Sequence, residues 1–259
     1  MKLRGMGLVC TGGVTQSFLA RMPSVLSRLG PVKASSFRVS RQISRSLRAG
    51  QAASHYSALE PCPIVFFAVP EAMLDRALID FAAQTPLHKT MIVLCDCERA
   101  SCKPGPLSHT GARVASLNAV PEMQERTFIA EGHSDTVRVI GRLLEQDGRR
   151  LIELDAAAKP LFFAGTRFAG ALLLPWIAGA VESLRLAGLT RAEAATVTEN
   201  IGMRALRKYV KAGPRAWNRN TAASLRHALE GDLKAIRGGD SRLAELYDYG
   251  IRTALGKFR

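Results

Sequence analysis

Acidic residues are absent from the first 59 positions of the chain. The first carboxylate is Glu60, whereas nine lysines and arginines precede it, and the 259-residue chain carries a formal net charge of +14. This imbalance favours an anionic partner: nucleic acid, an anionic membrane or a phosphorylated small molecule. Transit peptides share this composition, but these residues also follow a strand–turn–helix–strand order, which disfavours targeting. No nucleic-acid-binding motif or interleaved aromatic pattern is found, which disfavours nucleic acid.

Long uninterrupted apolar runs are also missing. The run Gly7–Cys10 is too short for a secretory signal. The most apolar segment, 160–186, is interrupted by Arg167, Pro175 and Glu182, so we expect a buried helix and no membrane span.

Cysteines are few and odd in number. Five free thiols without an export signal indicate a reducing, cytoplasmic location. The pair Cys95 and Cys97, with Cys102 nearby, matches none of the usual zinc spacings, so we expect no metal site.

The organising motif lies near the N-terminus. An apolar run, Met6–Cys10, meets a turn of small residues and then a segment of helical spacing. This is the opening unit of a dinucleotide-binding fold, in which backbone N–H groups and a helix N-terminus face a pyrophosphate. Of the three glycines in G-x-G-x-x-G only the middle one is present, because the positions hold Cys10, Gly12 and Thr15. We expect these residues to bind the cofactor: Thr11, Gly12, Gly13 and Val14. An α/β domain that merely begins this way is the alternative.

The next strand bears on the choice of cofactor. We predict a strand over Val32–Val39, followed by Ser40 and Arg41. An acid after this strand accepts the ribose hydroxyl of NAD, whereas arginine suits the 2′-phosphate of NADP. No acid is present, but Arg38 and Arg41 are, and a guanidinium can hold a phosphate with two hydrogen bonds. NADP is therefore the preferred cofactor, with Ser40 nearby; a solvated basic helix face is the alternative.

Strands and helices then alternate up to Leu154. Apolar runs predict strands over 63–69, 90–95, 112–117, 127–130 and 151–154, and helices over 72–83 and 133–146. This order predicts an α/β domain with a doubly wound, mostly parallel sheet, spanning residues 1–155.

The sequence pattern over residues 156–259 predicts only helices. We expect a long helix over 156–186 kinked at Pro175, a helix opened by a capping box from Thr190 to Glu193, a third helix starting at Asn220 or Thr221, and a last one over 242–255. The long helix carries more apolar surface than one small bundle needs, which suggests a homodimer through this all-α domain.

Several stretches resemble a known family. Ile64–Leu74, with its apolar strand ending in Val-Pro-Glu, Gly111–Leu117, Phe128–Gly132 and Gly213-Pro214 are similar to motifs of the Rossmann-like proteins that carry a C-terminal domain of unknown function 2520. That family lies within the superfamily of 6-phosphogluconate dehydrogenase and pyrroline-5-carboxylate reductase.

The departures from this family concern polar positions. The family's His-Thr-Ser-Gly corresponds to Leu94–Cys97 here, its Tyr-His-Ala-Ala to Phe162–Gly165, and the histidine of its Ser-Leu-His-Pro to Asn118. The apolar positions that bear the fold are kept, while the groups suited to proton transfer are replaced.

The resemblance implies an NADP-dependent oxidoreductase that reduces a small acidic or imine-like substrate. It implies that the loop Ala68, Val69 and Pro70 lies beside the dinucleotide, and that the substrate lies between the nucleotide and the long helix, where Arg167 could meet a carboxylate. Asn118 and Arg167 are the candidate catalytic residues. A catalytically degenerate scaffold or binding protein without turnover is the alternative.

Overall fold

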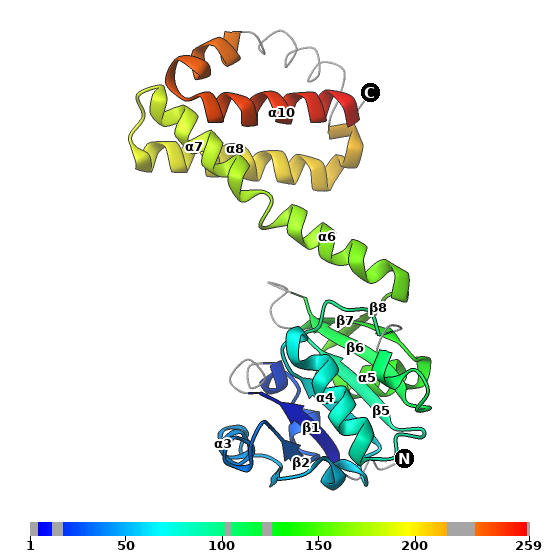
Figure 1. The fold of residues 1–259 in the computed structure, drawn as a ribbon. Helices are drawn as coiled ribbons and strands as arrows, with labels where there is room; N and C mark the ends of the chain where they lie inside the picture. Colours follow the sequence, from blue (N-terminus) through cyan, green and yellow to red (C-terminus); the bar gives the residue numbers. More distant parts are fainter. Residues whose placement is uncertain (1–4, 12–17, 102–104, 121–125, 217–230, 258–259) are drawn as a thin grey trace. The chain divides into compact units, whose positions relative to one another are not determined.

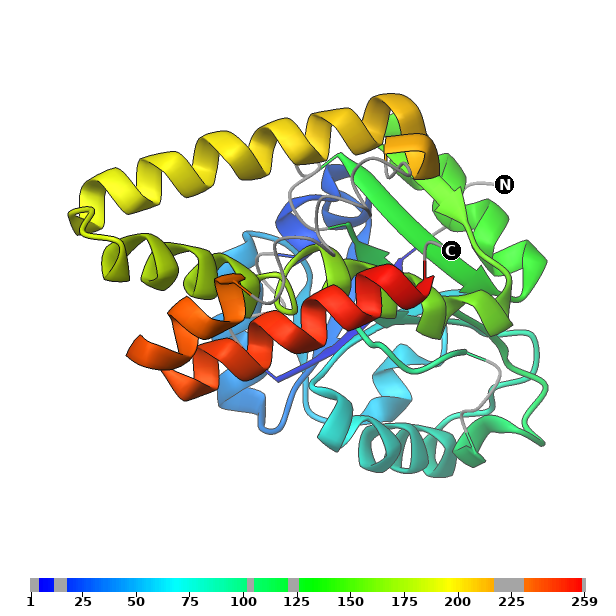
Figure 2. The same cartoon turned by 90° about the horizontal axis from the view of Figure 1, so that it is seen from above.

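The computed structural model describes residues 5–11, 18–101, 105–120, 126–216 and 231–257. The chain divides into two compact units, Met1–Ala164 and Gly165–Arg259. The first contains every strand of the described residues, and the regular elements described in the second are all helices (Figures 1 and 2).

Eight strands of the first unit form one sheet in the order β3-β2-β1-β4-β5-β6-β7-β8 (Figure 1). The strands are β1 (Met6–Cys10), β2 (Leu29–Lys33), β3 (Gln51–Ala53), β4 (Ile64–Ala68), β5 (Met91–Cys95), β6 (Arg113–Ala119), β7 (Thr127–Gly132) and β8 (Arg150–Glu153). Neighbouring strands are parallel except for β6 and β7, which are antiparallel. The first six strands follow the order of doubly wound dinucleotide-binding sheets. The predicted doubly wound, mostly parallel sheet is confirmed.

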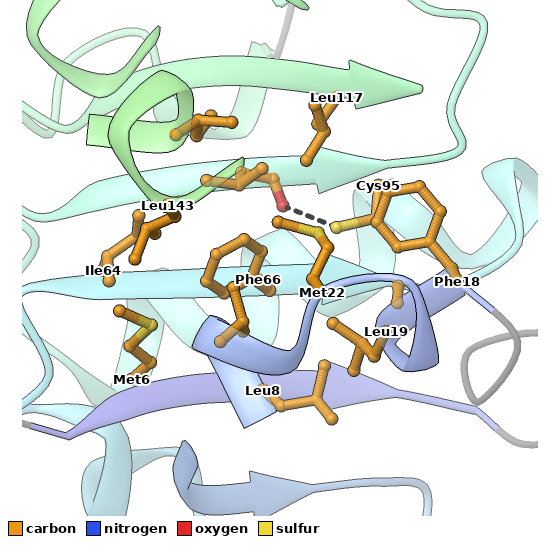
Figure 3. Packing of buried hydrophobic residues seen from close by; sticks show 14 of the residues in the cluster. Met6, Leu8, Phe18, Leu19, Met22, Ile64, Phe66, Cys95, Leu117 and Leu143 are labelled. Atoms are coloured by element: carbon orange, nitrogen blue, oxygen red, sulfur yellow. Dashed lines mark hydrogen bonds between the residues drawn. The ribbon is translucent and has the colours of Figure 1, made fainter. Parts of the chain in front are cut away.

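Helices cover both faces of the sheet. They are α2 (Pro23–Leu26), α3 (Phe37–Leu47), α4 (Glu71–Gln84) and α5 (Ser134–Gln146), with short 3-10 helices η1 (Tyr56–Leu59), η2 (Gly105–Leu107) and η3 (Ala156–Ala158). Because successive strand residues point to opposite faces, one core cluster joins Leu8 and Phe66 to Leu143 of α5 (Figure 3). The other joins Val9 and Phe67 to α4. Strands buried on both faces explain the continuous apolar runs of the sequence.

The expected second strand over Val32–Val39 is wrong. The strand is β2, and residues from Phe37 onward form α3, which begins after the N-cap Ser36. Gly30 and Pro31 are residue types that often end an element, yet both lie within β2, where the register with β1 shifts. Proline cannot donate to a ladder and is accommodated at such irregularities. The short strand β3 is not predicted from the sequence.

The helical part of the chain contains α6 (Lys159–Ala169), α7 (Leu174–Leu186), α8 (Arg191–Ala212), η4 (Gly213–Ala216) and α10 (Ser241–Lys257). The long apolar stretch is not one helix kinked at Pro175. It breaks after Ala169, and Pro175 lies in the first turn of α7, where its missing N–H is harmless. The capping box at Thr190 is confirmed. The expected start of the third helix lies outside the described residues, and residues 231–239 are helical.

The expectation that this apolar stretch is buried is also wrong. Among the described residues, the stretch Lys159–Leu186 is long and apolar enough to cross a membrane, by length and composition alone. No residue in its most apolar 18-residue segment is buried. The large apolar side chains exposed on α6 to α8 include Leu161, Phe168, Leu174, Ile201, Leu206 and Val210.

Candidate functional site

The order of the strands reverses between β1 and β4, and ligands of doubly wound sheets bind outside the carboxyl ends of the strands at such a point. At this edge Cys10 of β1 lies opposite Ala68 of β4. Thr11 follows Cys10, while Val69 and Pro70 follow Ala68 and lead into α4. The structure therefore brings these predicted cofactor residues together. The expected Gly12, Gly13 and Val14 lie outside the described residues.

Cys10 replaces the first glycine of the fingerprint. Its side chain is buried in the core cluster that includes Leu8 and the apolar residues of α5. Burial raises the pKa of this thiol to about 12, against the smaller opposing effect of Lys33. Cys10 is therefore a neutral core side chain.

Ser40 belongs to the packing between β2, β3 and α3. It is buried, accepts a hydrogen bond from the backbone N–H of Ala34 at 2.8 Å, and has the carbonyl oxygens of Ser36 and Ala53 at 3.1 and 3.2 Å. These contacts tie α3 to the ends of β2 and β3. They leave Ser40 no exposed surface for a cofactor.

Arg38 and Arg41 lie in the first half of α3, directly after β2, and both are exposed. They are three residues apart, so they share one side of the helix. Within the described residues neither has an ion-pair partner. The N-terminus of a helix and two unpaired guanidinium groups form a surface suited to a phosphate.

A buried polar cluster, which the sequence analysis missed, lies on β6 and β7. Glu131 of β7 lies opposite Ser116 of β6, and the Ser116 hydroxyl donates to its carboxylate at 2.6 Å. Ser101 donates to the same carboxylate through its backbone N–H at 2.7 Å and its hydroxyl at 2.6 Å. The Lys159 ammonium donates to Ser116 and to the Arg99 carbonyl oxygen, both at 2.7 Å, and lies 3.7 Å from Glu131.

This cluster fixes the start of α6 to the sheet. The side chains of Lys159 and Glu131 are 0% and 1% exposed. Burial lowers the pKa of Lys159, and the attraction of Glu131 opposes part of that shift. An isolated acid within the apolar strand 127–132 is the sequence signal that could have indicated such a pair, because buried charges need partners.

Asn118, one of the two candidate catalytic residues, lies two residues beyond Ser116 on β6, toward the carboxyl end of that strand. It is 4% exposed. Its Nδ2 donates to the carbonyl oxygen of Cys97 at 3.1 Å. Its Oδ1 is buried and has no hydrogen-bond partner among the described residues. Buried polar atoms without a partner are rare in folded proteins, so this oxygen stands out.

Asp96 follows β5 at the same edge of the sheet. Its backbone is in the left-handed region, with φ 51°, and its N–H donates to the Leu117 carbonyl oxygen at 2.9 Å. Desolvation raises the pKa of its carboxyl group, opposed by a hydrogen bond from the Ala119 backbone and by Arg21. Aspartate is among the non-glycine residues that adopt this conformation most often.

The remaining predicted groups lie elsewhere. Arg167 is exposed in the last turn of α6, in the second unit. Burial raises the pKa of both the Cys95 and Cys97 thiols, which keeps them protonated. Within the described ranges no three His, Cys, Asp or Glu side chains are grouped to hold a metal ion.

No family model matches the chain, and no curated protein sequence is similar to it. Solved structures are similar at 10–15% identity. An imine reductase from Aspergillus terreus has a TM-score of 0.70 at 15% identity, covering 96% of this chain and 95% of its own. An imine reductase from Myxococcus stipitatus in complex with NADP+ has a TM-score of 0.65 at 14% identity, with 97% and 94% covered.

A pyrroline-5-carboxylate reductase from Coxiella burnetii has a TM-score of 0.53 at 13% identity, with 97% of both chains covered. The likeness spans both units of the chain. The protein thus has the fold of these solved structures, and its own Rossmann-like sheet is followed by a helical region.

Proposed function

We propose that this protein is an NADP-dependent oxidoreductase that reduces a small acidic or imine-like substrate. The observation that carries the proposal is the surface at the end of β2, where Arg38 and Arg41 are exposed without ion-pair partners among the described residues. A 2′-phosphate distinguishes NADP from NAD, and arginines at this place in the fold suit it. The similar imine reductase from Myxococcus stipitatus was solved with NADP+.

The proposed roles follow the edge of the sheet. Backbone groups from Thr11 to Val14 would hold the pyrophosphate, with Ala68, Val69 and Pro70 beside the dinucleotide, while Arg38 and Arg41 would hold the 2′-phosphate. Ser40 is withdrawn from this set because it is buried in structural hydrogen bonds. Bound NADPH would supply a hydride.

The substrate site is proposed at the carboxyl ends of β5 and β6. Asp96 follows β5 at this edge of the sheet, and we propose that its exposed carboxyl group exchanges a proton with the reacting group. Arg167 of α6 remains a separate prediction, as a cation for a carboxylate group. The motif resemblance further suggests a divergent member of the family with domain of unknown function 2520.

A homodimer through the helices of the second unit completes the proposal. The buried apolar side chains among its described residues are Ala194, Leu243, Ala244 and Ile251, whereas many large apolar side chains on α7 and α8 are exposed. A region of this size with so small a core gains most by burying these faces against another copy.

The second candidate is a scaffold without turnover. It is favoured by the apolar residues at positions where the resembled family has proton-transferring groups, such as Leu94 and Phe163. Under this alternative the cofactor could bind, but no imine or keto acid would be reduced with NADPH.

The test is a comparison of NADPH and NADH binding by fluorescence titration. Replacing both arginines (Arg38→Ala with Arg41→Ala) should weaken NADPH binding by at least about tenfold, because charge-assisted hydrogen bonds to phosphate are lost. NADH binding should be nearly unchanged. The matched control is Arg142→Ala, which removes an exposed arginine from α5. Absence of NADPH binding at millimolar concentration would refute the proposal.

A further inference from the structure

The unpaired oxygen of Asn118 has a definite orientation. The Cys97 carbonyl oxygen can only accept a hydrogen bond, so the Asn118 atom 3.1 Å from it must be the donor Nδ2. The other atom is therefore the acceptor Oδ1, which is buried and has no partner among the described residues. Leaving a buried acceptor unpaired is costly, and a ligand that donates to it recovers that cost.

The chemistry of the amide restricts its role. A carboxamide does not titrate at ordinary pH, so Asn118 cannot serve as a general acid, although its position made it a catalytic candidate. What it offers is a neutral acceptor for an N–H group. A neutral imine nitrogen is itself an acceptor and does not match.

The position of Asn118 selects the ligand. In this fold each half of the sheet takes one mononucleotide of the cofactor. The arginines of α3 follow β2, on the adenosine side, while Asn118 ends β6, three strand spacings from β1 on the other side. That separation is about 14 Å across the sheet. The half containing β4, β5 and β6 is therefore the nicotinamide half.

We infer that Asn118 Oδ1 accepts a hydrogen bond from the carboxamide N–H of the nicotinamide ring, which makes Asn118 a cofactor-positioning residue. This inference rests on the proposed function, because it requires NADPH to bind. Since Asn118 is 4% exposed, a neighbouring side chain must move for the carboxamide to reach it. The hydrogen bond from Nδ2 to the Cys97 carbonyl oxygen fixes the orientation of the Asn118 amide, so the amide need not rotate for Oδ1 to accept a hydrogen bond.

The experiment uses a cofactor that lacks the donor. In 3-acetylpyridine adenine dinucleotide phosphate a methyl group replaces the carboxamide NH₂. The wild-type protein should bind NADP+ about tenfold more tightly than this analogue, because the analogue leaves Oδ1 unpaired. In the Asn118→Leu variant the two affinities should become equal within about twofold.

Two controls separate this result from a general loss of structure. Binding of 2′,5′-ADP, which has the adenosine phosphates but no nicotinamide, should be unchanged in Asn118→Leu. Ser116→Ala alters the neighbouring polar position on the same face of β6 and should keep the preference for NADP+.

The outcomes are distinguishable. If NADP+ and 2′,5′-ADP both fail to bind the wild-type protein, the proposed function fails. If both bind but Asn118→Leu keeps the tenfold preference, the inference is overturned and the proposed function stands. A variant that keeps the preference but has a raised substrate KM would assign Oδ1 to the substrate and would equally overturn it.

Discussion

The two units of this protein differ in the extent to which their apolar side chains are buried. The sheet of the first unit is buried on both faces, and its strands β1, β4 and β5 are buried at every position. In the second unit α8 buries only Ala194 among its described side chains, and its exposed residues include Leu206 and Val210. The first unit therefore has the core of an independent domain, whereas the second has a small core among its described residues, which the proposed homodimer would extend.

The units also differ in where charge is placed. In the first unit Glu131 and Lys159 are fully buried and satisfied by serine and backbone groups. The ion pairs of the second unit, such as Glu182 with Arg185, lie on the surface. Buried pairs are costly to break and surface pairs are not. The predictions below use this contrast.

The largest effect is expected from Glu131→Gln. The substitution leaves the buried Lys159 ammonium without its counter-charge, which should lower the free energy of unfolding of the first unit by roughly 3–5 kcal/mol. Urea unfolding followed by circular dichroism measures this. The control Asp135→Asn, which breaks the partly exposed pairs with Arg113 and Arg138, should cost about 1 kcal/mol or less.

The pair itself is tested by the double variant Glu131→Gln with Lys159→Met. Because it leaves no buried charge, it should regain part of the stability that Glu131→Gln loses. A single variant within about 1 kcal/mol of the wild type would show that the cluster contributes little to the first unit.

Introducing charged side chains on α8 should affect folding less, but it should change the oligomeric state. Leu206 and Val210 are 55% and 77% exposed and four residues apart, so they share one side of the helix. Leu206→Glu with Val210→Glu should weaken the proposed homodimer by at least about thirtyfold, as loss of a hot spot of about 2 kcal/mol does. Light scattering after gel filtration should show the 28.0 kDa chain in place of twice that mass.

The exposed control Arg142→Glu on α5 should leave the assembly unchanged. A wild-type protein that is monomeric at micromolar concentration would contradict the proposed dimer. It would also mean that α8 is stable with its apolar side uncovered, which would remove the contrast between the two units.

The sheet could be predicted because each buried strand corresponds to a continuous apolar run in the sequence. The predicted strand over 63–69 contains β4, and that over 90–95 contains β5. The second strand failed because Gly30 and Pro31 usually end an element, and only the pairing with β1 shows that they lie inside one. A shift in the hydrogen-bond register depends on the neighbouring strand, so it leaves no pattern in the local sequence.

The candidate site was predictable to a similar extent. Thr11 and the Ala68–Pro70 loop follow apolar strands, so the fold places them at one edge. The pairing of Glu131 with Lys159 joins residues far apart in the chain, and single-sequence periodicity carries no information on such a contact. Asn118 was singled out by its place in the resembled family motif. Its unpaired Oδ1 could be recognised only in the structure, where the Cys97 carbonyl oxygen accepts a hydrogen bond from Nδ2.

The smallest effect concerns alkaline pH and should act on the first unit, because all five cysteines lie in it. Burial raises the pKa of Cys10 from 9.0 to about 12, so above pH 9 the unfolded chain loses this proton while the folded chain keeps it. Stability should therefore fall as pH rises from 9 to 12, by roughly 1 kcal/mol at pH 10 for this thiol. Lys159, whose pKa is lowered, acts in the opposite direction as pH approaches 10.5, so the comparison must be made between variants. Between pH 8 and pH 10 the free energy of unfolding of the Cys10→Ala variant, measured with urea, should fall by roughly 1 kcal/mol less than that of the wild type. Equal losses would mean that this thiol ionises in the folded protein as readily as in the unfolded chain, and that the edge of β1 is open to water.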